Sequence, residues 1–260
     1  MAKILHSINE YGDELITFQE KLPRFILPEL NTHRAFSRNL SSSRAIPTKK
    51  IIQQVIDDPA MPVHWGKNRP GMQATEEIAS CESIWLHARD NAVRAAEEMV
   101  LEGLHKQVVN RVLEPFMKVT AVISTTLPGF VNFLSLRDHE DAQPEIRALA
   151  KAMRDEWQEG EPQELAEGEW HIPYLTCAEL EFPLEERLML SAARCASVSF
   201  NSISDGKLID LENANRIWKK LIASTPAHAS PVEHQARAGF MGQSSRNFVG
   251  FIQHRHILGL

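Results

Sequence analysis

The spacing of apolar residues changes along the chain, and this change limits the fold class most strongly. In residues 3–8 (KILHSI) and 13–19 (DELITFQ), apolar and polar side chains alternate on both sides of a Tyr11-Gly12 turn, which predicts a hairpin of two short strands. Residues 75–118 and 140–158 instead carry apolar residues three and four positions apart, as amphipathic helices do. We therefore expect an α+β fold in which a small antiparallel sheet packs with several long helices.

Proline, glycine and polar segments mark the boundaries between the remaining elements. Pro28 interrupts a helix expected from residue 23 to about residue 44, and residues 57–74 form a loop rich in proline and glycine that is too long for a simple connection. A polar linker is expected at 159–173, followed by helices at 184–200 and 211–224 and by an irregular end. One domain covering residues 1–260 is the simplest arrangement.

Composition excludes several classes of protein. The chain has 260 residues, 43% of them hydrophobic, and a formal net charge of −6, which indicates a globular protein without general affinity for nucleic acid. We find no apolar run long enough to span a membrane, and the first ten residues, MAKILHSINE, lack the features of a signal peptide. A cytoplasmic protein without a membrane partner is expected.

Cysteine and histidine usage gives no metal site or disulfide framework. The three cysteines, Cys81, Cys177 and Cys195, are far apart and lack CxxC spacing. The histidine pairs 228/234 and 254/256 have spacing that a metal can use, but no cysteine or carboxylate completes a ligand set. No metal is expected.

Residues 30–50 (LNTHRAFSRNLSSSRAIPTKK) concentrate three arginines, two lysines and four serines in an acidic chain. A nucleoside monophosphate is an anion that needs such cations and hydroxyl donors, and Arg34, Arg44, Ser41 and Ser42 supply both within a short stretch. The alternative is a solvated basic helix face with capping serines. The residues of this stretch follow the pattern HRxxSxNxxSxR, formed by His33, Arg34, Ser37, Asn39, Ser42 and Arg44.

Four further segments accompany this pattern. They are Thr17-Phe18 in a predicted strand, NFLSLR followed by AQPEI (132–146), SAARCASVSF (191–200) and PAHASPVEH (226–234). Together with the arginine pattern they resemble the flavin-dependent thymidylate synthases, the ThyX family, whose motif reads RHRxxSxNxxSxR. The segments that open the family's sequence lie near the end of this one. The resemblance therefore implies a circularly permuted ThyX-like domain in which residues 10–158 correspond to the central and C-terminal part and residues 180–240 to the N-terminal part.

The resemblance implies an enzyme that transfers a one-carbon unit from methylenetetrahydrofolate to C5 of a pyrimidine deoxynucleotide, by default dUMP to dTMP. No side chain donates a hydride, so the family uses FAD, which NADPH reduces. A homotetramer is also implied. Arg137 would be the catalytic arginine that stabilises negative charge on the pyrimidine. The resemblance assigns FAD to His33, Arg34, Asn132, His228 and Ser230, and the nucleotide to Glu29, Thr32, Ser41, Ser42, Arg44 and Arg111.

Departures from the family pattern leave the substrate open. Glu29 replaces a glutamine that contacts the nucleotide, Thr32 replaces the first arginine of the motif, and Leu40 replaces a glutamate. Asn110 stands where an arginine is usual, with Arg111 next to it, while Thr126 and Pro128 replace the Asn and Arg of a flavin-binding triplet. A glutamate can accept a hydrogen bond from an exocyclic amine, so dCMP or a modified pyrimidine is an alternative ligand, as is hydroxymethylation.

Two other classes remain as alternatives. One is a flavin- or nucleotide-binding relative without turnover, and the other is a helical nucleic-acid-binding protein that uses residues 30–50. The cation-rich segment 65–74 (WGKNRPGMQA) would suit closure over a phosphate or a folate tail, with subunit packing as its alternative.

Overall fold

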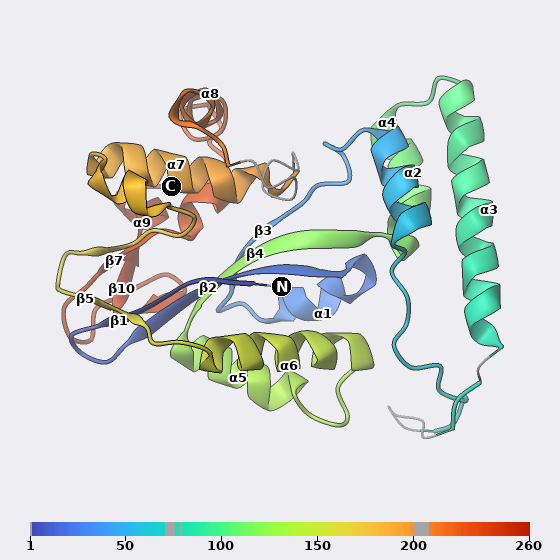
Figure 1. Cartoon of the computed structure of the whole chain (residues 1–260), viewed down its shortest axis with the longest axis horizontal. Helices are drawn as coiled ribbons and strands as arrows, with labels where there is room; N and C mark the ends of the chain where they lie inside the picture. The colour runs from blue at the N-terminus through green and yellow to red at the C-terminus, as the bar shows by residue number, and fades with distance from the viewer. Residues whose placement is uncertain (1, 71–75, 79, 200–207) are drawn as a thin grey trace.

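The computed structural model describes residues 2–70, 76–78, 80–199 and 208–260. It confirms the expected α+β class. A five-stranded sheet lies at the centre, with helices α5 and α6 on one face and α7 and α8 beyond the other, while α2, α3 and α4 form a group at one end (Figure 1).

The central sheet has the strand order β3-β4-β2-β1-β5. The two strands that come first in the sequence, β1 (Ala2–Asn9) and β2 (Glu14–Pro23), form the hairpin predicted around Gly12. Gly12 has a φ of 84°, a conformation that suits glycine. Strands β3 (Ser37–Leu40) and β4 (Lys118–Thr126) continue the antiparallel order, whereas β5 (Gln163–Leu165) pairs with β1 in parallel.

The apolar face of the sheet carries the largest core. Ile16 and Phe18 of β2 and Ile123 of β4 pack against Phe130 and Phe133, two of the buried aromatic residues of α5 (Leu127–Arg137). Helix α6 (Pro144–Gln158) closes this core, so the amphipathic helix expected at 140–158 is confirmed from Pro144 onward. The proline lies in the first turn, where its missing N–H leaves no bond unmade.

The opposite face of the sheet is polar and equally buried. Thr17 donates to or accepts from Ser124 over 2.7 Å, and these two hydroxyls contact His171 and His234 over 2.8 and 2.9 Å. Burial lowers the pKa of both histidines to about 3, so their rings are neutral. His234 belongs to the segment PAHASPVEH. The hydroxyl of Ser124 contacts both the ring of His234 and the hydroxyl of Thr17, so it connects this segment to strands β4 and β2.

Helices α7 (Leu184–Ala196) and α8 (Leu211–Leu221) lie beyond this polar layer and confirm the two helices predicted there. Arg194 of α7 is almost fully buried. Its guanidinium donates to both carboxylate oxygens of Glu179 over 2.7 Å and to the carbonyl oxygens of Tyr174 and Ile209. These contacts satisfy the buried charge and fix α7 to the segments on both sides of it.

The third group consists of α2 (Thr48–Asp57), α3 (Cys81–Leu101), α4 (Lys106–Val109) and the 3-10 helix η2 (Asn110–Phe116). Its core includes Ile51, Val93 and Leu113. The helix expected within 75–118 thus ends at Leu101, and it is followed by α4, by η2 and, from Lys118, by β4. The expected loop at 57–74 contains only one isolated bridge, Gly66 to Glu77, in its described part.

Two predictions about local structure before residue 174 are wrong. Residues 23–44 contain only η1 (Arg24–Ile26) and α1 (Leu27–Thr32), because Pro28 begins a helix and the arginine motif then pairs as strand β3 with β4. The linker at 159–173 contains β5 and β6 (Trp170–His171).

The end of the chain is ordered rather than irregular. Strands β7 (Ala236–Ala238) and β10 (Phe251–Gln253) form a second sheet with β6, and β8 (Ser244–Ser245) pairs with β9 (Phe248–Val249) before α9 (His254–Ile257). In the part of the chain described here, every helix is too short or too polar to cross a membrane.

Candidate functional site

Arg137, at the C-terminal end of α5, meets the beginning of the arginine motif. Its Nε donates to Nε2 of His33 over 2.9 Å, and its Nη2 donates to the hydroxyl of Thr32 over 3.2 Å. Thr32 in turn donates to the carbonyl oxygen of Glu29 over 2.6 Å. Three residues singled out in two distant segments of the sequence therefore form one contact group.

His33 is buried and serves as an acceptor for Arg137. Burial and, to a smaller extent, the positive charges of Arg137 and Arg38 together lower the pKa of His33 to about 4, so the ring is neutral near pH 7. Its ring also meets that of Phe133 edge to face, with centroids 4.9 Å apart. Since Nε2 is already engaged, the ring positions Arg137, and its predicted contact with FAD stays a prediction.

A close contact fixes the motif against α5. A Cβ added to Gly129 would lie 2.7 Å from Oγ1 of Thr125 and 2.8 Å from Cβ of Ala35, so only glycine permits this approach. Arg38 completes the turn by donating to the carbonyl oxygens of Leu30 and His33 over 3.2 and 2.7 Å. The position of His33 is therefore fixed by the close contact of Ala35 with α5 and by the hydrogen bond from Arg38 to its carbonyl oxygen.

The serine-rich part of the motif forms a second group next to η2. Asn110 is fully buried, and its Nδ2 donates to the carbonyl oxygens of Ser43 and Ile46 over 2.6 and 3.1 Å. Ser41 is also buried, and it exchanges hydrogen bonds with the main chain of Thr120. Asn110 thus holds the loop that carries Ser42 and Arg44, a structural role for a position where the family has an arginine.

Glu114 takes up part of the charge of this second group. Its Oε1 accepts from Ser43 over 2.8 Å, from Arg111 over 2.9 Å and from Arg24 over 3.1 Å. Arg44 is exposed, with one long contact of 3.4 Å from its Nη2 to Gln107. Of the two arginines predicted to bind phosphate here, Arg44 is the less engaged by protein groups.

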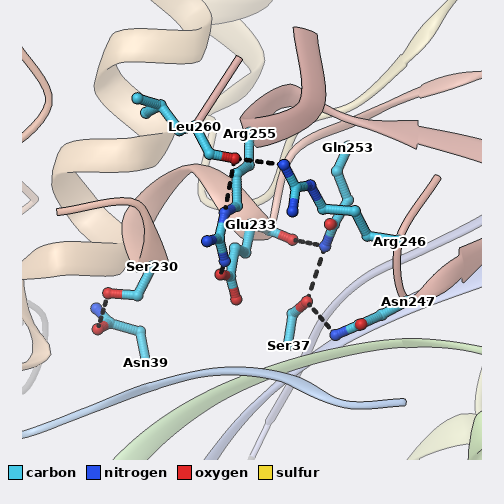
Figure 2. A network of polar contacts seen from close by, with 9 residues as sticks. All are labelled: Ser37, Asn39, Ser230, Glu233, Arg246, Asn247, Gln253, Arg255 and Leu260. Atoms are coloured by element: carbon cyan, nitrogen blue, oxygen red, sulfur yellow. Dashed lines mark hydrogen bonds and ion pairs between the residues drawn. The ribbon is translucent and has the colours of Figure 1, made fainter. Parts of the chain in front are cut away.

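Asn39 connects the motif to the C-terminal part of the chain. Its Oδ1 accepts from the hydroxyl of Ser230 over 3.2 Å, and its Nδ2 donates to the carbonyl oxygen of Cys195. Figure 2 shows this contact beside a second one, in which Nε2 of Gln253 donates to Ser37 over 2.8 Å. Ser230 therefore contacts the motif, while His228, two residues earlier, is exposed, and the flavin contacts of both stay predictions.

The structure places the remaining flavin-site predictions at the surface. Arg34 and Asn132 are exposed, and in the described residues neither side chain has a hydrogen-bond or ion-pair partner. A guanidinium and an amide of this kind fit the pyrophosphate and the polar ring edge of a flavin. Thr126 and Pro128 begin α5, Thr126 as its N-terminal cap residue and Pro128 in its first turn, and supply no such donors.

Apart from the exposed Arg34, Asn132 and His228, the predicted residues with side-chain contacts fall into three groups. These are Arg137 with Thr32 and His33, the serine loop with Arg44 and Arg111, and Asn39 with Ser230. No hydrogen bond between described residues joins the first group to the second. No cluster of three or more His, Cys, Asp or Glu residues in the described ranges could hold a metal ion.

Sequence reasoning missed four residues that shape these groups: Arg38, Glu114, Gln253 and Glu233. Arg38 and Glu114 lie next to motif positions, but their contacts depend on which carbonyl or hydroxyl the fold places opposite them. Gln253 and Glu233 belong to the end of the chain that was expected to be irregular.

Comparison with known proteins gives consistent results. The family model described as thymidylate synthase complementing protein matches residues 13–163, more than half of the chain. Over 146 residues the chain is 27% identical to the flavin-dependent thymidylate synthase of Aquifex aeolicus (strain VF5), which covers 55% of this chain and 45% of that protein. The chain thus spans less than half the length of this curated relative. The family resemblance inferred from the motifs is confirmed.

Among solved structures, the chain is similar to the UMP/dUMP methylase PolB from Streptomyces cacaoi, solved with 5-Br UMP bound. The identity is 18%, the TM-score is 0.45, and the match covers 55% of this chain and 67% of that one. The family match ends at residue 163, so the permuted origin of residues 180–240 stays a prediction.

Proposed function

The chain belongs to the thymidylate synthase complementing protein family, and on this premise we propose that it transfers a one-carbon unit to C5 of a pyrimidine deoxynucleotide, with dUMP as the default substrate. Methylenetetrahydrofolate would supply the carbon, and NADPH would reduce the flavin. FAD, when bound, supplies the hydride that leaves the transferred carbon as a methyl group. A homotetramer in the cytoplasm is part of the same proposal.

The contact between Arg137 and His33 carries the proposal, because it joins two motifs 104 residues apart. A neutral His33 accepts from Nε, which fixes the plane of the guanidinium and leaves N–H groups on both Nη atoms for a ligand. A guanidinium held in this way can stabilise the negative charge that develops on the pyrimidine when its C5 forms the new bond. Ser42 and Arg44 would bind the phosphate, and Arg34, Asn132 and His228 would hold the flavin.

The test compares Arg137→Gln with Arg94→Gln, which removes an exposed arginine of α3. Reduced, FAD-loaded protein receives methylenetetrahydrofolate and either dUMP or dCMP under anaerobic conditions, and the methylated nucleotide is quantified. We expect product with wild type and Arg94→Gln, and a loss of roughly 100-fold or more with Arg137→Gln, the typical effect of removing one transition-state donor. A wild-type protein that binds FAD and nucleotide but forms no product contradicts the proposal.

That negative result would support a second candidate, nucleotide binding without turnover. It is favoured by Asn110 and Arg111, since the first is buried in the serine loop and the second is paired with Glu114. Retained affinity for dUMP or dCMP without product would distinguish this candidate from a protein that binds neither nucleotide.

A further inference from the structure

A cavity of about 330 Å³ lies where the turn that follows β5 meets the beginning of α7. This volume is large enough for a small organic ligand. Its wall includes Leu165 at the end of β5, Glu169 and Trp170 after it, and Leu184 and Arg187 of α7. The cavity thus combines apolar and aromatic surface with two side chains of opposite charge.

Arg187 and Glu169 line the same cavity without forming an ion pair. The Nε atom of Arg187 is buried, and its guanidinium has no hydrogen-bond or ion-pair partner in the described part of the chain. Glu169 uses only Oε2, which accepts from the main-chain N–H of Ala166 over 2.8 Å. A guanidinium has five N–H donors and each carboxylate oxygen has two lone pairs. Both charged groups therefore keep hydrogen-bonding capacity for a ligand, and their two charges cancel.

The turn that carries Glu169 is fixed by main-chain contacts. Its N–H donates to the carbonyl oxygen of Ala166 over 3.0 Å, and its own carbonyl oxygen accepts from the N–H of Ala238 over 2.8 Å. The ring of Trp170 meets the buried ring of His254 edge to face, with centroids 5.6 Å apart. The carboxylate and the indole thus lose little freedom when a ligand binds, which favours affinity.

A comparison within α7 shows that Arg187 does not serve the fold. Arg194 is buried on the same helix, and its guanidinium is satisfied by both oxygens of Glu179 and by main-chain carbonyl oxygens. Arg187 is half-buried and has no such partners. Partial burial of a charged group without a partner is unfavourable, and a bound carboxylate would remove this cost.

We propose that this cavity binds a zwitterionic α-amino acid with an apolar side chain. Arg187 binds its carboxylate through forked N–H donors, Oε1 of Glu169 accepts from its ammonium group, and Trp170 and Leu165 contact its side chain. The five glutamates of residues 159–169 disfavour a purely anionic ligand, whereas a zwitterion has no net charge. The site shares no residue with the three groups of the candidate functional site and does not depend on the proposed methyl transfer.

The test is a calorimetric titration of the full chain with L-phenylalanine and two analogues. The first analogue, 3-phenylpropanoate, lacks the ammonium group, and the second, 2-phenylethylamine, lacks the carboxylate. We expect saturable binding of L-phenylalanine and an affinity lower by about tenfold or more for each analogue, because each leaves one charged side chain of the cavity without its partner. L-leucine, which has a smaller apolar side chain, is titrated in parallel.

Two variants assign the two charged groups of the ligand. Arg187→Gln breaks no hydrogen bond between described residues, so its urea midpoint should be unchanged, while L-phenylalanine should bind about tenfold more weakly. Glu169→Gln keeps an oxygen that can accept from Ala166, and it should weaken L-phenylalanine but not 3-phenylpropanoate. Arg216→Gln, which removes an exposed arginine of α8, is the control and should leave the affinity within about twofold of wild type.

Three outcomes would overturn the proposal. The first is the absence of saturable binding for both L-phenylalanine and L-leucine. The second is equal affinity of the two analogues and L-phenylalanine, since the charged groups of the ligand would then play no part. The third is an equal effect of Arg187→Gln and Arg216→Gln on the binding of L-phenylalanine.

Discussion

Glu20 is a buried carboxyl group whose protonation should control the pH dependence of stability. It lies in β2 with no exposed surface, and neither of its oxygens has a hydrogen-bond partner among the described residues. Burial and, to a smaller extent, the negative charge of Glu156 together raise the pKa of Glu20 from 4.5 to about 8. The folded protein therefore keeps Glu20 protonated near pH 7, whereas the unfolded chain ionises it.

The sign and the size of the effect follow from this difference. Because the folded-state pKa lies above the unfolded value, the folded protein binds more protons, and stability falls as the pH rises from about 4.5 to about 8. Each unit of pKa difference corresponds to about 1.4 kcal/mol, so Glu20 should cost about 3 kcal/mol at pH 7 relative to pH 4.5. Above pH 8 the cost should stay constant.

The assay is urea unfolding of wild type and Glu20→Gln at several pH values between 5 and 9. The amide cannot ionise, so the free energy of unfolding of the variant should exceed that of wild type by an amount that grows by about 1 kcal/mol per pH unit up to pH 8. Glu164→Gln, which removes an exposed carboxyl group of β5, is the control and should run parallel to wild type. Parallel curves for wild type and Glu20→Gln would refute the reasoning.

Two further substitutions test the contacts that shape the candidate site. Asn110→Ala should lower the free energy of unfolding by about 2 kcal/mol in urea, because it leaves two buried carbonyl oxygens without their donor; an unchanged midpoint would show that the serine loop is held by other contacts. Gly129→Ala should destabilise by about 1 to 3 kcal/mol through its clash with Ala35, and it should weaken nucleotide binding by displacing His33 from Arg137; normal stability and binding together would contradict the close contact.

Periodicity predicted the elements that depend on local sequence. The β1–β2 hairpin and helices α6, α7 and α8 appear where alternation or helical spacing indicated them. Strand β3 was missed because its four residues, Ser37–Leu40, contain three polar side chains. Their extended conformation comes from pairing with β4, which lies about 80 residues further along the chain.

The candidate site was predictable to the extent that its residues belong to motifs. The motifs singled out Thr32, His33 and Arg137 as separate candidates, but the sequence did not predict the hydrogen bonds that Arg137 makes to the other two. The spacing of three residues between Arg111 and Glu114 allows an ion pair on a helix, but this spacing is too common to predict one. Which charges remain for a ligand depends on such partners, and only the fold supplies them.

The motif strand β3 shows why the matched region alone cannot account for the site. It is an edge strand of the central sheet, and folded proteins usually cover the unpaired backbone groups of such a strand with other parts of the chain. That cover comes from side chains beyond residue 163: Gln253 donates to Ser37, and Ser230 donates to Asn39. Two of the six motif positions are therefore used to attach the C-terminal segment, which leaves the exposed Arg34 and Arg44 as the motif residues best placed to bind a ligand. It follows that changes in the C-terminal segment should act on ligand binding through the position of β3.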